Sequence, residues 1–143
     1  MTTGTVSRPA GGRAMSPRER DNRRLLRARD AIERDYGRPL DVPALARIAH
    51  VSPSHFSRSF RAVFGETPHR YLQRRRIERA MALLRDTTSP VTDVALLVGF
   101  SSLGTFSRTY RDVVGVSPSE YRRRARQVAA PVCFTKSWLR PAG

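Results

Sequence analysis

Residues 56–76 read FSRSFRAVFGETPHRYLQRRR, and residues 106–126 read FSRTYRDVVGVSPSEYRRRAR. The two stretches align without a gap at an offset of 50, and ten of their 21 positions are identical. Further upstream, Ala46 matches Ala95 at an offset of 49, so the second copy has one additional residue in or just after its turn. Two copies are too few for a solenoid. They indicate one supersecondary unit that is used twice.

The second half of each copy has the periodicity of an amphipathic helix. Phe56 and Phe60 lie one helical turn apart, as do Phe106 and Tyr110 in the second copy. Side chains at this spacing occupy one face of a helix, and we expect that face to be buried. No stretch alternates with the period of a β-strand, so the chain is predicted to be all-α with about seven helices.

A short helix and a tight turn precede each of these amphipathic helices. Ala46 stands four residues before His50, and Ala95 stands four residues before Gly99. This spacing puts a small residue where two helices cross and a turn residue after it. A short helix, a turn and a second helix with one polar side form a helix-turn-helix unit. The sequence therefore predicts two such units joined by a long central helix.

Capping residues divide the chain into segments. Ser16-Pro17-Arg18-Glu19 has the pattern of a capping box that starts the first helix, and Gly37 is placed to end that helix. A second capping box, from Ser117 to Glu120, precedes the last helix. The predicted segments are a flexible basic arm (1–15), a folded domain (16–126) with helix-turn-helix units at about 41–65 and 90–115, a linker helix at about 67–85 and a last helix at about 118–126, and a C-terminal tail (127–143).

The composition is strongly basic. The 143 residues include 27 Lys+Arg against 12 Asp+Glu, a formal net charge of +15, and Lys136 is the single lysine. Such a charge indicates a polyanionic partner, with nucleic acid first and an anionic membrane surface second. Arginine favours nucleic acid, because its planar fork matches phosphates and guanine edges. No apolar run is long enough to span a bilayer, and the N-terminus lacks the apolar segment of a secretory signal.

The sequence offers little for catalysis or for a cofactor. Its one cysteine, Cys133, excludes an internal disulfide and a multi-cysteine metal site, and suits a reducing cytosol. His50, His55 and His69 form no pair at metal-ligand spacing. No Gly-rich phosphate loop is present. We therefore expect no catalytic residue, no metal and no cofactor.

The polar side of each amphipathic helix carries groups suited to a DNA major groove. These groups are Ser54, Ser57, Arg58 and Arg61 in the first copy and Gly104, Thr105, Arg108 and Arg111 in the second. The arginine runs 74–76 and 122–124 are expected to lie partly on a solvated face and partly against the DNA backbone, because a helix cannot point three consecutive side chains the same way.

Several of these motifs are typical of one family. They are Leu45-Ala46, Ser52-Pro53-Ser54, Phe56-Ser57-Arg58-Ser59-Phe60, Val98-Gly99-Phe100-Ser101, Phe106-Ser107-Arg108-Thr109-Tyr110, Gly115 and Ser117-Pro118-x-x-Tyr121-Arg122. In these residues the chain resembles the DNA-binding domain of the AraC/XylS family of bacterial transcription regulators, over roughly residues 22–126. The resemblance implies seven helices, two helix-turn-helix units on one long helix, and sequence-specific binding to double-stranded promoter DNA, with RNA polymerase as a further partner.

The resemblance also implies which residues read the bases. Carried over position by position, the expected base contacts are Ser54, Ser57, Arg58, Gly104, Thr105 and Arg108. Gly104 has no side chain, so Leu103 is expected to touch a thymine methyl group there. For Arg61 and Arg111, pairing with a carboxylate is the alternative to a phosphate. The expected phosphate contacts are Arg61, Arg111, Arg74, Arg75, Arg122 and Arg123.

The length of the linker helix fits binding by one chain. A helix over residues 67–85 would be roughly 28 Å long, and successive major grooves on one face of the duplex lie about 34 Å apart. Two recognition helices could then enter adjacent grooves. The shortfall of several ångströms implies either that the DNA bends toward the protein, which is our hypothesis, or that one helix docks poorly. Because tandem copies lack a two-fold axis, we expect an asymmetric site that is bound by a monomer.

Other functions remain open at this level. The alternative is a non-specific architectural or RNA-binding protein that acts through charge alone, and a third possibility is a regulator linked to a methyl-accepting cysteine domain. About 20 residues precede the first family helix, too few for a sensing domain. The resemblance is therefore to the short, sensor-less members, with a fragment of a longer regulator as the alternative. We expect the chain to act in the bacterial cytoplasm, at the nucleoid.

Overall fold

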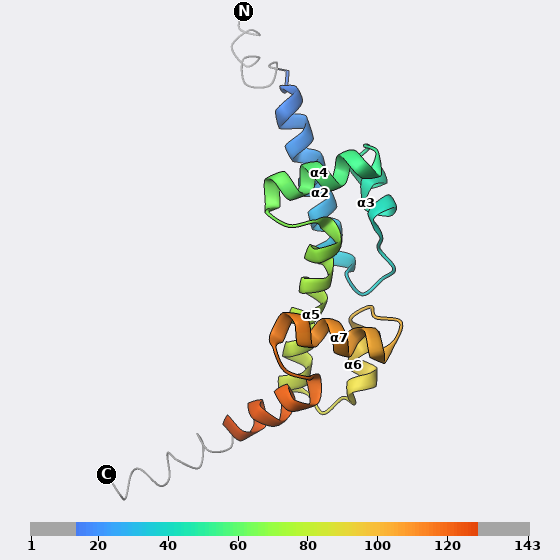
Figure 1. Ribbon diagram of the computed structural model, residues 1–143. Coiled ribbons are helices and arrows are strands. Elements are labelled where there is room, and N and C mark those ends of the chain that lie inside the picture. Colours follow the sequence, from blue (N-terminus) through green and yellow to red (C-terminus); the bar gives the residue numbers. More distant parts are fainter. Residues whose placement is uncertain (1–13, 129–143) are drawn as a thin grey trace, which may run out of the picture.

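The computed structural model describes residues 14–128, and within them all regular structure is α-helical (Figure 1). The predicted all-α fold with seven helices is confirmed for these residues. The labelled helices are α2 (Pro17–Asp35), α3 (Val42–Ile48), α4 (Pro53–Phe64), α5 (Pro68–Asp86), α6 (Val91–Leu97) and α7 (Leu103–Val114). The last helix spans residues 118–128. Most of the expected arm and tail, residues 1–13 and 129–143, lies outside the described residues.

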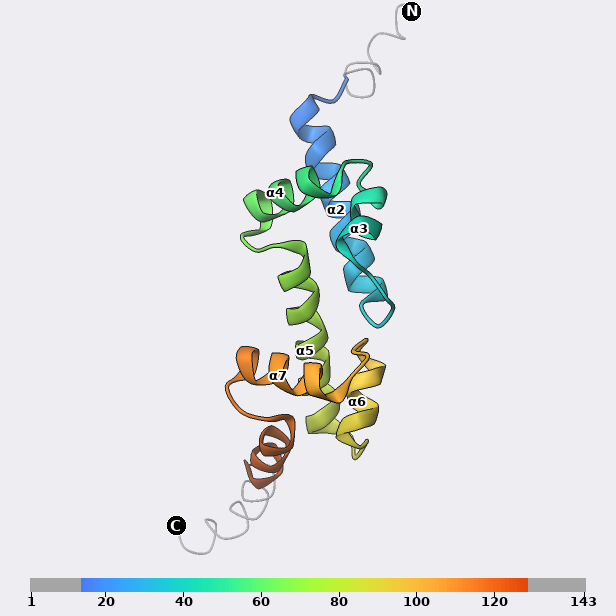
Figure 2. The same ribbon diagram turned by 45° about the vertical axis from the view of Figure 1, so that its right-hand side comes forward.

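The repeat extends over three helices rather than two. Helices α2, α3 and α4 have 19, 7 and 12 residues, and α5, α6 and α7 have the same lengths in the same order. In both units a long helix is followed by a short helix and an amphipathic helix that cross it (Figures 1 and 2). We call α2–α4 the first unit and α5–α7 the second unit. The sequence repeat did not reveal that α2 is the counterpart of α5.

Helix α5 connects the two units. Its N-terminal end packs on α4 of the first unit, and the rest of the helix packs on α6 and α7. Its 19 residues correspond to roughly 28 Å at about 1.5 Å per residue. Figure 2 shows α4 near one end of this helix and α7 near the other. The long helix therefore sets the distance between the two helix-turn-helix units.

Most helices begin with the predicted side-chain caps. The capping box of α2 is complete, because Ser16 Oγ accepts from the Glu19 N–H at 3.1 Å and the Glu19 carboxylate accepts from the Ser16 N–H at 3.4 Å. The box predicted for the last helix is only half formed. The Ser117 hydroxyl accepts from the Glu120 N–H at 3.1 Å, whereas the Glu120 carboxylate binds Arg123 and Arg124 of its own helix. These arginines compete for the carboxylate and draw it away from the cap.

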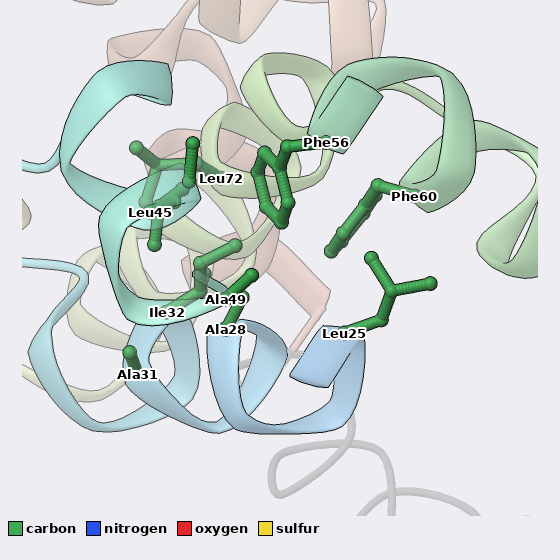
Figure 3. Close-up of a cluster of buried hydrophobic side chains, with 10 residues drawn as sticks. Leu25, Ala28, Ala31, Ile32, Leu45, Ala49, Phe56, Phe60 and Leu72 are labelled. Carbon is green, nitrogen blue, oxygen red and sulfur yellow. The ribbon is translucent and has the colours of Figure 1, made fainter. Parts of the chain in front are cut away.

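Each unit has its own hydrophobic core. In the first core, α2 and α3 pack on α4 and on the start of α5 around Phe56 and Phe60 (Figure 3). The second core lies between the rest of α5, α6 and α7, around Phe106 and Tyr110. All four of these aromatic side chains are fully buried, which confirms the predicted inward face. The first core consists of Leu25, Ala28, Ala31, Ile32, Leu45, Ala46, Ala49, Phe56, Phe60 and Leu72, and the second of Ile77, Ala80, Leu84, Val94, Ala95, Val98, Phe100, Phe106 and Tyr110.

The sequence repeat is reproduced in the packing of the aromatic rings. Phe56 and Phe60 have ring centroids 5.6 Å apart at an interplanar angle of 56°, and the pair Phe106–Tyr110 has the same two values. The turns also correspond, because His50 and Gly99 both have positive φ, at 60° and 102°. Repeated residues therefore occupy equivalent places in two similar units.

Candidate nucleic-acid interface

Helix α4 has its aromatic side in the core and its polar side at the surface. Because Phe56 and Phe60 are buried, residues displaced around the helix from them must face outward. Ser54 and Arg58 are exposed, and Ser57 is half-buried. Ser52 caps the helix by accepting from the His55 N–H at 3.2 Å, so the first turn that carries Ser54 is fixed in place. The three predicted base-contacting residues of the first unit are thus brought together near one end of α4.

Helix α7 repeats this arrangement in the second unit. Thr105 and Arg108 are exposed, and so is Gly104, where an added Cβ would meet no atom within 4 Å. Leu103 has 43% of its side chain exposed. A large apolar side chain at the start of a recognition helix is available for a methyl group in a groove. The Ser102 hydroxyl donates to Thr105 Oγ1 at 2.9 Å and accepts from the Thr105 N–H at 3.1 Å.

Helices α4 and α7 have comparable orientations in the molecule. In Figure 1, α4 crosses in front of α2 and α7 crosses in front of α5, in nearly the same direction. The turned view of Figure 2 keeps this relation, with α4 and α7 on one side and α3 and α6 on the other. Neither face is covered by another part of residues 14–128, since Ser54, Arg58, Thr105 and Arg108 are all exposed.

Two of the predicted phosphate contacts lie next to these faces. Arg61 is in the last turn of α4 and Arg111 in the last turn of α7, and both are exposed. They occupy equivalent positions of the two units, on the same side of the helix as Arg58 and Arg108 by their spacing of three residues.

Arg74 and Arg75 instead form ion pairs within the protein. Arg74 lies 2.7 Å from Glu66 and 2.7 Å from Glu78, and its guanidinium stands 5.0 Å from the centroid of the Tyr71 ring. Arg75 binds Glu33 of α2 at 2.8 Å. A DNA phosphate would have to compete with these carboxylates, so the predicted phosphate contacts of Arg74 and Arg75 gain no support from the geometry.

Arg122 and Arg123 also have partners within the chain. Arg122 donates to the carbonyl oxygens of Leu84 at 3.0 Å and Thr87 at 3.3 Å, which would otherwise be left unpaired near the end of α5. Arg123 binds Glu120 on its own helix. Arg122 thus fastens the last helix to α5. The predicted phosphate contacts closest to the two polar faces are Arg61 and Arg111.

Comparison with known proteins agrees with this arrangement. A profile of the helix-turn-helix domain family matches residues 45–124, more than half of the chain. The C-terminal domain of AraT, a response regulator from Geobacillus stearothermophilus, superposes with a TM-score of 0.69 and 30% identity over 78% of this chain and 88% of that domain. The matched profile is of the AraC/XylS type. The chain belongs to the AraC/XylS family.

Relatives of this AraC/XylS protein are regulators of transcription. The probable transcriptional regulator LumQ of Photobacterium leiognathi is 35% identical over 75 residues, which are 52% of this chain and 30% of LumQ. The chain spans about a third of the length of LumQ and of three other curated relatives that it matches. Another neighbour is the DNA-binding domain of AdpA, a global transcriptional factor solved in complex with a target DNA, with a TM-score of 0.68 and 32% identity over 72% of this chain and 93% of that domain. Residues 14–128 are accordingly the DNA-binding domain of an AraC-family transcriptional regulator.

The described residues of the AraC/XylS domain provide neither a membrane-spanning helix nor a candidate metal site. None of the helices described between residues 14 and 128 has the length and apolar character needed to cross a membrane. The same residues contain no group of three or more His, Cys, Asp or Glu arranged to hold a metal ion. Cys133, the single cysteine of the sequence, lies outside the described residues.

A carboxylate of α2 joins the first unit of the AraC/XylS domain to its linker helix. Glu33 accepts from Arg75 Nε at 2.9 Å and from the Tyr71 hydroxyl at 2.8 Å. Partial burial raises the pKa of Glu33, but the hydrogen bonds from Arg75 and Tyr71 outweigh it and leave the pKa below its usual range. Partial burial and the bond to Glu33 together raise the pKa of Tyr71 to about 12. At neutral pH the Glu33 carboxylate is therefore ionised and the Tyr71 hydroxyl is protonated, which are the forms that make this hydrogen bond.

We expect Glu33→Gln to lower the free energy of unfolding by about 1 kcal/mol at pH 7, a value kept small because these side chains are partly solvated. A carboxylate whose folded pKa is depressed stabilises the protein above its unfolded pKa of about 4.3 and stops doing so as the pH falls through the folded value. The difference between the two proteins should therefore shrink below about pH 4. Urea denaturation between pH 3 and pH 7 measures it. Asp112→Asn, at an exposed carboxylate of α7, is the control, and an equal pH dependence of both variants would contradict this role.

Glu33 and Arg76 are structural residues of this AraC/XylS domain that could not be predicted from the sequence. Glu33 meets Arg75 across 42 positions of sequence, and no local pattern reports such a distant pair. Arg76 donates to the carbonyl oxygens of Tyr36 and Arg38, although the sequence shows only the third member of an arginine run. The one available signal was indirect: three consecutive arginines on a helix point in different directions and so need different partners.

Proposed function

We propose that this chain is a sequence-specific transcriptional regulator that binds an asymmetric promoter site, with α4 and α7 in adjacent major grooves. The observation that carries the proposal is a pair of exposed polar faces. One has Ser54 and Arg58 on α4, and the other has Thr105 and Arg108 on α7. Short hydroxyl groups next to a forked guanidinium suit base edges. A protein that bound DNA through charge alone would not need similar polar faces on two helices whose other sides pack in the hydrophobic cores.

Charge supplies the part of the affinity that does not depend on sequence. The net charge of +15 attracts any duplex. That attraction weakens as the salt concentration rises, because the counterions that binding releases from the DNA then gain less entropy. Within the proposal, Ser54, Ser57, Arg58, Leu103, Thr105 and Arg108 add discrimination between sequences. Arg61 and Arg111 hold phosphates beside them.

One polypeptide carries both proposed reading helices, so the proposal includes binding as a monomer, without an enzymatic activity. The tandem order of the units gives an asymmetric site, because a two-fold axis would be needed for a palindrome. RNA polymerase at the promoter is the proposed protein partner, and the bacterial nucleoid is the place of action. The AdpA domain in its complex with a target DNA supports a duplex as the ligand.

We expect Arg108→Ala to weaken binding to its preferred duplex by about 1–3 kcal/mol and to relax the preference at one base step. The preferred duplex is obtained by selection from random-sequence DNA with the full chain, followed by footprinting. Affinities are then measured on that duplex and on variants changed at single base pairs, at fixed salt.

The control is Arg79→Ala, which removes an exposed arginine from α5 rather than from α4 or α7. It should weaken binding to all duplexes by a similar small factor. If Arg108→Ala also loses the same factor on every sequence, Arg108 contacts a phosphate rather than a base. If the wild-type chain enriches no sequence at physiological salt, the proposal fails and the chain is a non-specific binder.

A further inference from the structure

A buried charged side chain on α5 separates the two hydrophobic cores. Leu72 belongs to the first core and Ile77 to the second. Between them lies Arg76, the only charged side chain in residues 14–128 that is buried, with 8% of its surface exposed. Apolar packing therefore does not continue from one unit to the other along this helix. What fixes the units relative to each other at this point must be found among polar contacts.

Arg76 reaches from α5 to the loop that follows α2. Its Nε donates to the carbonyl oxygen of Tyr36 at 2.7 Å, and its Nη2 donates to that of Arg38 at 2.9 Å. Its guanidinium also stands 5.8 Å from the centroid of the Phe100 ring, in the turn of the second unit. One side chain thus contacts the loop of the first unit and the turn of the second. The planar fork of arginine can bind two carbonyls and stack on a ring at once, whereas a lysine presents a point charge.

The main chains of the two units also approach each other closely here. A Cβ added to Gly99 would lie 2.7 Å from the carbonyl oxygen of Tyr36, and one added to Gly37 would lie 3.0 Å from that of Leu97. Both distances are too short for ordinary contact. Gly37 was predicted to end α2, but that helix ends at Asp35 with the right-handed Tyr36 as its C-cap, and Gly37 is not among the glycines with positive φ. The glycine is needed instead because the second unit lies against it.

We propose that Arg76 is a positioning residue that fixes the separation and relative rotation of α4 and α7, and thereby restricts the spacing between the two half-sites in DNA. The inference rests on the proposed two-groove binding. Without Arg76, the backbone contacts at Gly37 and Gly99 and the Glu33–Arg75 ion pair would remain, but no side chain would tie the middle of α5 to the carbonyls of Tyr36 and Arg38. Long helices curve gently rather than staying straight. A small bend at the middle of α5 would move α7 relative to α4, because each lies near a different end of that helix.

The test is a selection from duplexes in which two fixed half-sites, taken from the wild-type preferred sequence, are separated by a spacer of variable length. The wild-type chain should select duplexes with a single spacer length. Arg76→Met, which keeps an unbranched apolar stem and removes both hydrogen bonds, should return several. One inserted base pair shifts the second half-site by about 3.4 Å and rotates it by about 34–36°. We expect it to cost the wild type on the order of tenfold in affinity and the variant about threefold, roughly half of that free energy.

Two matched variants separate this role from charge and from folding. Arg79→Met removes an exposed arginine from the same helix and should keep the single spacing. Arg76→Lys keeps the charge but cannot hold both carbonyl oxygens and the Phe100 ring in the planar arrangement of a guanidinium. The range of spacer lengths that it selects should therefore lie between those of the wild type and Arg76→Met. It also serves as the working variant if circular dichroism shows that Arg76→Met is unfolded. A single unchanged spacing for both Arg76 variants would overturn the inference and leave the proposed function intact.

A measurement without DNA distinguishes failure of the inference from failure of the proposed function. Spin labels are placed at exposed positions of the two short helices, through Arg47→Cys on α3 and Thr92→Cys on α6 in a Cys133→Ser chain. The distance distribution between the labels should be narrow with Arg76 and clearly broader with Arg76→Met. An equally narrow distribution in both chains would show that Arg76 does not hold the units, whatever DNA the chain binds.

Discussion

Replacing Phe60 with alanine should lower the free energy of unfolding by about 3–5 kcal/mol, the range seen when a buried aromatic ring is removed. Phe60 is fully buried in the first core. Its ring centroid lies 5.6 Å from that of Phe56, 4.5 Å from that of Phe64 and 5.5 Å from that of Tyr71. Removing it would leave a cavity bordered by three other rings. Urea denaturation followed by circular dichroism measures the loss.

The location of this loss is also expected. Because the two cores are separate, amide hydrogen exchange should accelerate in α3 and α4 and change much less in α7. Uniform acceleration over residues 14–128 would show that the units unfold together. A loss below about 1 kcal/mol would contradict the packing described for the first core.

The second unit supplies a matched control. Tyr110 occupies the position equivalent to Phe60, and its hydroxyl is buried without a hydrogen-bond partner among the described residues. Burial raises the pKa of this hydroxyl, so it remains uncharged at neutral pH. Tyr110→Phe removes the unpaired group and keeps the ring. It should be neutral or stabilising by about 1 kcal/mol.

Gly99→Ala should be the most damaging single-methyl change in the domain, at about 3 kcal/mol or more. Two costs combine at this position. Its φ of 102° disfavours any side chain, and the added Cβ would lie 2.7 Å from the main-chain carbonyl oxygen of Tyr36. A carbonyl in a packed loop cannot turn aside as a flexible side chain can. The free energy of unfolding, again from urea denaturation, is the measurement.

Gly115→Ala isolates the first of these costs. Gly115 has a φ of 98°, but an added Cβ would meet nothing within 4 Å. Its loss should therefore be about 1–2 kcal/mol, the strain of a left-handed residue alone. Equal losses at the two glycines would mean that the loop at Tyr36 moves away easily and that the units do not press on each other.

Much of the fold could be predicted because its signals are local or repeated. Ser16 and Glu19 mark the start of α2 within four residues, and the buried rings Phe56 and Phe106 reveal themselves by spacing and repetition. The exposed faces of α4 and α7 follow from the same spacing, since the side opposite a buried stripe must face outward. These features can be predicted without knowing which segments of the chain contact each other in the folded protein.

The contacts between the units could not be predicted in this way. His50 and Gly99 are equivalent turn residues with positive φ, and the sequence explains why both are turn formers. It does not explain why the second must be glycine, because the reason is the Tyr36 carbonyl of the other unit. Similarly, Arg74, Arg75 and Arg76 read as one basic run, yet they bind Glu66, Glu33 and the Tyr36 carbonyl respectively. Partners some 40 residues away leave no trace in local periodicity.

The covalent linkage of both units through α5 has a consequence for how a promoter fills with protein. If both units bind adjacent grooves as proposed, then once one unit is docked the other searches only the short stretch of duplex within its reach, at an effective concentration far above that of the protein in solution. In this proposed monomeric mode, no association between chains has to come first. Occupancy of the full site should then rise hyperbolically with protein concentration, so small changes in expression would alter transcription gradually rather than as a threshold.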